Sequence, residues 1–268
     1  MRRTETILDE IFEARQETLR REQAQTSFAQ IEADLVGLPA GPATAFFDAL
    51  KIACDRPKII AEVKEASPSE GVIRDRFSLE EINQAYQAAD NVVGISILTE
   101  QTFFQGSSDR LRFIAQNNPN DKSLLRKDFL SDPYQVAESR WLGAHAYLLV
   151  AALFEQQELA ELVDAGRHYG IEPLVEVHSQ EELDMVLGIN ARCIGANSRD
   201  LRDFSTDLTV HDLLRQLDDS YGRVAESAIS TPRYLGEVAT FSDAALIGTE
   251  FMRSANIPAA IEAISGPA

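Results

Sequence analysis

Short apolar runs alternate with longer amphipathic stretches along most of this chain, from residue 58 onward. The apolar runs have the length and residue types of buried strands, and the stretches between them have helical spacing and length. Strands that alternate with helices predict a parallel sheet, and eight such units predict an α/β fold of the (β/α)8 TIM-barrel class. A doubly wound open sheet is the alternative. The eight predicted strands are 58–64, 94–99, 123–129, 146–150, 172–177, 191–197, 223–227 and 244–248.

The residues before the first strand follow a different pattern. Apolar residues recur at roughly helical spacing among many charged ones over 4–36, which predicts a helix. The glycine- and proline-rich run 37–42 should end it, and 43–53 predicts a second, short helix. We therefore expect residues 1–53 to form an N-terminal helical extension of a single barrel domain that spans residues 1–268.

Composition disfavours several classes of function. The chain has 268 residues, of which 44% are hydrophobic and 25% charged, as is usual for a protein with a packed core. A net charge of −18 disfavours binding to nucleic acid or to an anionic membrane, although local basic side chains can still hold a small anion. No apolar run has the length of a membrane span, and no secretory signal is visible. Cys54 and Cys193 form no C-x-x-C pair, so we expect a reduced, cytoplasmic protein.

Charged residues interrupt or end several of the predicted strands. Glu62 and Lys64 stand two positions apart in the first strand, so their side chains project to the same face. In a parallel barrel that face is the packed interior or its mouth, where unpaired charges cost several kcal/mol. Lys127, Glu176 and Glu226 take similar places in the third, fifth and seventh strands. Each alone is ordinary for a solvated loop residue, but together they favour an active site at the C-terminal strand ends.

Other segments near the strand ends add features of a ligand site. The loop 67–71 is rich in turn-forming residues, which let a ligand approach backbone N–H groups. The fourth strand is apolar over 147–150 and is expected to form a floor or wall of the site. The four histidines show no metal-ligand spacing, so no metal site is expected.

These strand ends resemble, in order, the motifs of indole-3-glycerol phosphate synthases, the ring-closing enzymes of tryptophan biosynthesis. The segments E-V-K-E-A-S-P-S-E-G, L-L-R-K-D-F-L-S-D-P-Y-Q and I-G-A-N-S-R-D-L resemble the first, third and sixth motifs, which are specific as a set. The second, fifth, seventh and eighth are I-S-I-L-T-E-Q-T-F-F-Q-G-S, L-V-E-V-H, A-E-S and L-I-G-T-E-F-M-R. The resemblance runs from about residue 58 to 253, and the N-terminal helices fit the extension that this family carries.

The resemblance implies a carboxy-lyase that needs no cofactor. It would convert 1-(2-carboxyphenylamino)-1-deoxyribulose 5-phosphate into indole-3-glycerol phosphate, carbon dioxide and water. Lys127 matches the general acid of ring closure, Glu176 the group that moves protons during dehydration, and Lys64 the partner of the substrate carboxylate. Residues that match positioning groups are Glu62, Asn197 and Glu226. Residues implied to contact the substrate or its phosphate are Ser67, Phe104, Phe129, Arg199, Ser227, Ala228, Gly248 and Thr249.

The implied partner is a small phosphosugar, with neither nucleic acid nor a membrane, and a monomer is the expected state. One position departs from the family, which usually has Glu-Ser-Gly where this chain has Glu226, Ser227 and Ala228. Alanine keeps the backbone N–H that would face a phosphate but adds a Cβ and restricts φ.

Two alternatives stay open, a phosphosugar barrel like phosphoribosylanthranilate isomerase and a non-catalytic barrel used for binding or regulation. The trio Glu62, Lys64 and Lys127 argues against the isomerase, and the presence of both lysines and of Glu176 argues against a non-catalytic barrel.

Overall fold

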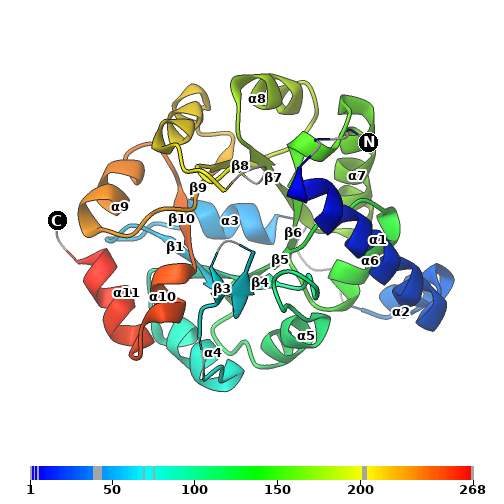
Figure 1. Ribbon diagram of the computed structural model, residues 1–268, viewed down its shortest axis with the longest axis horizontal. Coiled ribbons are helices and arrows are strands. Elements are labelled where there is room, and N and C mark those ends of the chain that lie inside the picture. The colour runs from blue at the N-terminus through cyan, green and yellow to red at the C-terminus, as the bar shows by residue number, and fades with distance from the viewer. Residues whose placement is uncertain are drawn as a thin grey trace.

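Parallel strands close into a barrel at the centre of the protein (Figure 1). The computed structural model describes residues 2, 4, 6–38, 44–68, 70–74, 76–200 and 204–266. The first strand pairs with the second on one side and with the last on the other, because Ile59 lies opposite both Val92 and Ala245. The open-sheet alternative is therefore wrong, and the TIM-barrel prediction is confirmed. In the described part of the chain the eight barrel strands are β1 (Ile59–Val63), β4 (Val92–Leu98), β5 (Ser123–Lys127), β6 (Ala146–Val150), β7 (Glu172–Val177), β8 (Cys193–Asn197), β9 (Gly222–Glu226) and β10 (Ala244–Ile247).

Helices form an outer ring around the barrel, and local signals in the sequence mark their ends. Helix α6 (Pro133–Trp141) begins with a capping box, in which Asp132 accepts from the backbone of Tyr134 and the side chain of Gln135 accepts from the backbone of Asp132. Helix α7 (Gln156–Tyr169) is followed by Gly170, whose φ of 71° is the left-handed conformation that glycine adopts easily. Between β8 and β9 the chain forms a 3-10 helix. The helices that follow β1 in the chain are α4 (Leu79–Ala88), α5 (Ser108–Gln116), α6 (Pro133–Trp141), η1 (Ala151–Leu153), α7 (Gln156–Tyr169), α8 (Gln180–Leu187), η2 (Leu208–Gln216), α9 (Pro232–Val238), α10 (Thr249–Arg253) and α11 (Ile257–Ser265).

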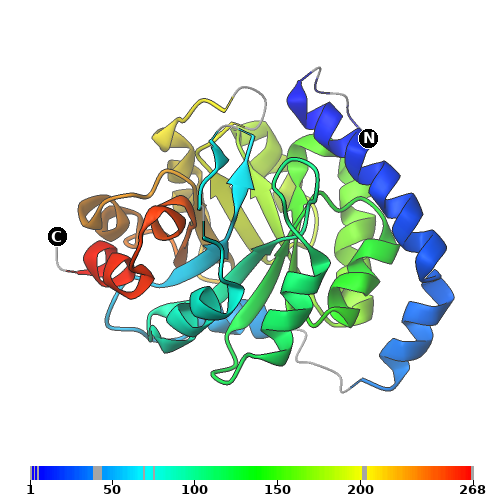
Figure 2. The ribbon, with the colours of Figure 1, turned by 60° about the horizontal axis from the view of Figure 1, so that its bottom comes forward.

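The predicted N-terminal helix over 4–36 is two helices, α1 (Ile7–Gln25) and α2 (Phe28–Val36). The chain breaks at Ser27, whose side chain accepts from the backbone of Gln30 and so caps the second helix. Figure 2 shows both helices running along the outside of the barrel. The hydroxyl of Tyr134 on α6 donates to the backbone of Thr26, which fixes the break against the ring of helices.

A third short helix, α3 (Ala45–Lys51), covers the N-terminal end of the barrel. Its side chains Phe46 and Leu50 are buried in the main hydrophobic core. Its backbone at Phe47 donates to the carboxylate of Glu172, the first residue of β7. The helix therefore closes the end of the barrel opposite the predicted site.

The loop expected after β1 contains a small antiparallel hairpin, β2 (Ala66–Ser67) and β3 (Gly71–Val72). Residues Ala66 and Ser67 are buried, whereas Gly71 and Val72 are exposed. The loop prediction thus missed regular structure, because two-residue strands carry too little pattern to be seen in a sequence. The hairpin stands over the barrel mouth in Figure 2.

Candidate active site

A cavity of about 260 Å³ opens at the C-terminal ends of the barrel strands. All fourteen residues that the sequence suggested as site residues lie in its wall. The apolar strand β6 contributes Leu148 and Val150, as expected for a floor or wall. The predicted residues that line the cavity are Glu62, Lys64, Ser67, Phe104, Lys127, Phe129, Glu176, Asn197, Arg199, Glu226, Ser227, Ala228, Gly248 and Thr249.

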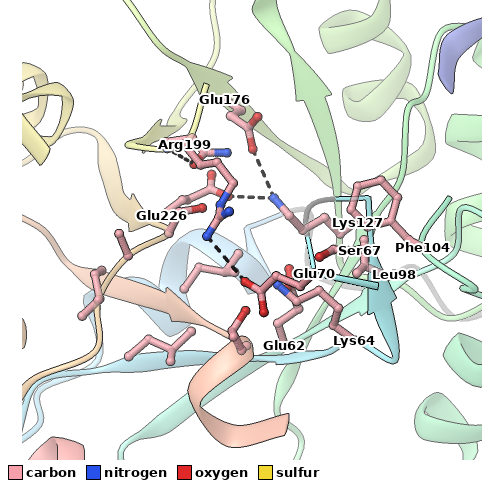
Figure 3. Close-up of a pocket in the computed structure, with 18 of the residues that line it drawn as sticks. Glu62, Lys64, Ser67, Glu70, Leu98, Phe104, Lys127, Glu176, Arg199 and Glu226 are labelled. Atoms are coloured by element: carbon pink, nitrogen blue, oxygen red, sulfur yellow. Dashed lines mark hydrogen bonds and ion pairs between the residues drawn. The ribbon is translucent and has the colours of Figure 1, made fainter. Parts of the chain in front are cut away.

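The side chain of Lys127 lies between two buried carboxylates (Figure 3). Its Nζ is 3.1 Å from Oε2 of Glu176 and 2.8 Å from Oε2 of Glu226. Burial alone would lower the pKa of Lys127, but the charges of Glu226 and Glu176 outweigh it and raise that pKa. The ammonium form is therefore the resting state of this lysine.

The two carboxylates beside Lys127 have different acidities. Burial raises the pKa of Glu226 to about 7, and the nearby charge of Glu176 adds to the rise while Lys127 opposes it. Burial also favours the neutral form of Glu176, but the charges of Lys127 and His178 outweigh it and lower the pKa of Glu176. One ammonium fully compensates only one carboxylate, so Glu226 is the group in this cluster that titrates near neutral pH.

Glu62 and Lys64 form an ion pair of 3.1 Å on the opposite side of the cavity. The expectation that both side chains point to one face is confirmed. Gly248 leaves room for this pair, because a Cβ there would clash with the carboxylate of Glu62. Gly195 on β8, which sequence reasoning missed, does the same for Glu226. These glycines let carboxylates occupy the interior of a packed barrel.

The segment after β9 has a strained backbone. Ser227 and Ala228 have φ values of 68° and 55°, in the left-handed region that favours glycine. This is the position at which the sequence departs from the family pattern. Gly248 and Thr249, which begin the short helix α10, line the same cavity. Residues 201–203, which follow Arg199 and Asp200, lie outside the described part of the chain.

Two charged residues that the sequence did not suggest lie at the mouth of the cavity. Glu70, in the turn between β2 and β3, is 2.8 Å from Arg253 on α10 and 3.8 Å from Arg199 after β8. Figure 3 shows the contact between Glu70 and Arg199 across the opening. These residues belong to three segments that are far apart in the sequence, and only the closed barrel brings them together.

Arg126 and Asp128, which flank Lys127 in the sequence, point away from it, into the layer between the barrel and the helices. Asp128 accepts from Arg126 at 3.3 Å, from Thr99 at 2.7 Å and from Arg15 of α1 at 3.1 Å. Both arginines are buried, and they hold the pKa of Asp128 down although burial opposes this. The network attaches α1 to β5 directly behind Lys127.

Among the described residues, no group of three histidine, cysteine, aspartate or glutamate side chains could hold a metal ion. The residues that line the cavity include two lysines, five glutamates, an asparagine and two arginines: Lys64, Lys127, Glu62, Glu70, Glu176, Glu226, Glu250, Asn197, Arg199 and Arg253. Paired acids and bases of this kind can move protons to and from an anionic ligand.

Comparison with known proteins points to a single enzyme family. A family model described as Indole-3-glycerol phosphate synthase matches residues 8–264. An indole-3-glycerol phosphate synthase from Dehalococcoides mccartyi (strain CBDB1) is 39% identical over 256 residues, which cover 94% of this chain and 97% of that protein. An indole-3-glycerol phosphate synthase from Campylobacter jejuni subsp. jejuni is 37% identical over 260 residues, which cover 96% of this chain and 99% of that protein. The solved structure of 3-hexulose-6-phosphate synthase from Salmonella typhimurium has a TM-score of 0.61 at 12% identity, covers 77% of this chain and 96% of that one, and is alike in fold alone.

Proposed function

The chain belongs to the indole-3-glycerol phosphate synthase family, and we propose that Lys127 and Glu176 carry out the proton transfers of that reaction in the cavity at the strand ends. The substrate is 1-(2-carboxyphenylamino)-1-deoxyribulose 5-phosphate, and the products are indole-3-glycerol phosphate, carbon dioxide and water. The observation that carries the assignment of residues is the ammonium of Lys127, held between two buried carboxylates on the cavity wall.

Ring closure needs an acid at the ketone oxygen. The aromatic carbon that bears the carboxylate attacks the ketone carbon, and Lys127 donates a proton to the oxygen as the new carbon–carbon bond forms. The bond to the carboxylate then breaks, its electron pair restores the aromatic ring, and carbon dioxide leaves. Lys64, paired with Glu62 in the resting site, is suited to hold the substrate carboxylate during this step.

Dehydration needs a group that both gives and takes a proton. The hydroxyl leaves as water after it receives a second proton, and the carbon next to the nitrogen loses one. We assign both transfers to Glu176, because it contacts Lys127 and is the more acidic of the two neighbouring carboxylates. Glu226 is assigned to position Lys127, because the two side chains are in contact. Asn197 is assigned to position Glu176, because its hydrogen bond contributes to the lowered pKa of that carboxylate.

The substrate phosphate is placed in this proposal against the backbone N–H groups near Ala228, Gly248 and Thr249, with Ser67 as a further donor. These residues line one cavity wall, and left-handed backbone of the kind seen at Ala228 can direct N–H groups toward an anion. Phe104 and Phe129 pack 6.1 Å apart between ring centres at the side of β4 and β5, where they would contact the aromatic ring of the substrate. A crystal with phosphate bound elsewhere and this wall empty would contradict the placement.

A fluorescence assay for indole product tests the function directly. The wild-type protein should form product from the carboxyphenylamino-deoxyribulose phosphate without added metal or cofactor. Glu176→Gln should retain KM and lose turnover, because the amide still fills the site but cannot exchange a proton. If the wild-type protein formed no product, the proposal would be contradicted. If Glu176→Gln had a raised KM and a normal kcat, Glu176 would only bind substrate.

The isomerase-like alternative is not favoured, because the whole-chain matches are to synthases. No described helix is both long and apolar enough to cross a membrane. Both cysteines are free thiols. We propose a cytoplasmic monomer that binds no nucleic acid, built as one barrel domain with residues 1–53 as its extension. Gel filtration checks the monomer.

A further inference from the structure

His178 contacts the Glu176 carboxylate from outside the cavity wall. It lies directly after β7, and its Nε2 is 3.4 Å from Oε1 of Glu176. Its Nδ1 is 3.5 Å from Oε2 of Glu182 on α8, and the same oxygen accepts from the His178 backbone at 2.7 Å. The exposed fractions of the three side chains are 1% for Glu176, 9% for His178 and 16% for Glu182. They therefore form a line from the buried site toward solvent.

The atoms that face each other in this pair belong to two largely buried side chains. In the described part of the chain, Oε1 of Glu176 and Nε2 of His178 are both buried and make no hydrogen bond. Buried polar atoms in native proteins are nearly always paired, so two of them facing each other need an explanation. Catalytic hydrogen bonds are often long in ligand-free sites and shorten in the complex. A small approach would convert this contact into a hydrogen bond.

The groups that surround His178 favour its charged form. Glu176 on β7, Glu182 on α8 and Asp200 after β8 face it, and all three are carboxylates. Burial alone would lower the pKa of His178, but the bond to Glu182 and the charge of Glu176 outweigh it and raise the pKa. On its far side Glu176 meets Lys127 of β5, so it lies between an imidazole and an ammonium group.

The proposed reaction draws one proton from solvent in each turnover at neutral pH. The leaving oxygen takes two protons to become water, and the carbon next to the nitrogen returns one. The carboxylate leaves as neutral carbon dioxide and supplies none. One proton must therefore reach groups that are almost completely buried, and Lys127 cannot supply it without being recharged.

We propose that His178 relays this proton to Glu176, acting as a positioning residue that works through that carboxylate. This inference rests on the proposed function. Nε2–H of His178 gives its proton to Oε1 of Glu176, and Nδ1 takes a proton from solvent beside Glu182. Glu176 gives that proton to the leaving hydroxyl, takes the carbon proton, and passes it to the neutral amine of Lys127. The resting charges are then restored, with one proton consumed.

Two substitutions of His178 separate relay from simple hydrogen bonding. In His178→Gln the terminal amide can still donate to Glu176 but cannot pass a proton on, and in His178→Ala the imidazole space is empty. We expect kcat to fall about tenfold or more in both, with KM within about twofold, because the residue acts by proton transfer and does not line the cavity as described. Added free imidazole should restore part of kcat in His178→Ala and leave His178→Gln unchanged.

The matched control is His145→Gln, the same exchange at the residue before β6 on the other end of the barrel. It should leave kcat within about twofold of wild type, since it changes no group in the site. A wild-type kcat in His178→Gln, or no rescue of folded His178→Ala by imidazole, would overturn the relay. These outcomes are read against an active wild type, whereas an inactive wild type would refute the proposed function.

An NMR titration without substrate tests the relay even if the His178 variants fail to fold. The ring protons of His178 in the wild-type protein should titrate by NMR above the ordinary pKa of 6.5, and Glu182→Gln should lower that midpoint. Glutamine at position 182 can still accept from the His178 backbone, so the fold is kept. A midpoint that Glu182→Gln does not move would remove the outer member of the relay and overturn it.

Discussion

Glu226→Gln and Glu176→Gln should change stability in opposite directions at alkaline pH, although both carboxylates contact the same ammonium. The folded-state pKa of Glu226 is raised to about 7, so the folded protein binds its proton more tightly than the unfolded chain does. The stability linked to that proton is fully present below pH 4.5 and is lost as the pH rises toward 7. The glutamine variant avoids this loss.

The magnitude follows from the two pKa values. A rise from 4.5 to about 7 at about 1.4 kcal/mol per unit gives roughly 3 kcal/mol at pH 8 and about 1 kcal/mol at pH 5. Glu226→Gln should therefore be more stable than wild type by up to about 3 kcal/mol at pH 8. The pKa of Glu176 is lowered, so its contribution is present above its ordinary pKa and is lost only as the pH falls through the folded value. Glu176→Gln should be less stable than wild type at pH 8 and approach it in acid.

Equilibrium unfolding in urea measures both effects, with the single tryptophan, Trp141, as the fluorescent probe. With a slope of about 3 kcal/mol per molar urea, Glu226→Gln should unfold about 1 M later than wild type at pH 8. The gain should shrink at pH 5. If both variants were destabilised equally at both pH values, the assignment of the raised pKa to Glu226 would be wrong.

Three other substitutions test separate parts of the site. Lys127→Ala should lower kcat at least about 10²-fold in the indole assay, and Lys127→Arg should fail as well, because guanidinium does not release a proton near neutral pH; near-normal turnover in either would refute the general acid. Ala228→Gly should relieve about 1 kcal/mol of left-handed strain and raise the thermal midpoint by about 2–4 °C, with a lower KM if the Cβ crowds the phosphate; an unchanged midpoint would mean that the strain is absent. Glu70→Gln should remove a negative charge beside Arg199 and Arg253 and so lower KM for the anionic substrate at low salt; a KM equal to that of wild type at low salt would contradict this.

Much of the fold and the membership of the site could be predicted from periodicity. Successive side chains in a strand face opposite sides of the sheet. Glu62 and Lys64 are two positions apart, so they share one face wherever the strand lies. The C-terminal ends of parallel strands meet at one rim, which brings Lys127, Glu176 and Glu226 together once the barrel closes. The helix break at Ser27 was missed because apolar spacing continues across it, while the signal for the break is a single capping side chain.

Contacts between distant loops could not be predicted, because nothing local encodes them. Glu70 and Arg253 have the pattern of ordinary solvated charges in the sequence, and Arg199 is indicated only by the family resemblance. Likewise Arg126 and Asp128 flank Lys127 in the sequence, yet both face the helices, where Asp128 accepts hydrogen bonds from Arg126 and from Arg15 of α1. The alternation on β5 predicts that these neighbours of Lys127 face away from it, but not which partners lie behind the sheet.

The geometry of the barrel explains why the charged cluster consists of these particular residues. Glu62, Lys127 and Glu176 belong to the first, third and fifth strands, and Glu226 belongs to the seventh. Side chains in one layer of such a barrel come from alternate strands, so four residues that are far apart in the chain point to one centre. The strands between them must then leave space, and Gly195 does so where any Cβ would overlap the Glu226 carboxylate. A glycine in the middle of a strand weakens it, and here that cost permits a carboxylate to lie against the ammonium of Lys127. The cluster is therefore a property of barrel closure as much as of its four charged residues.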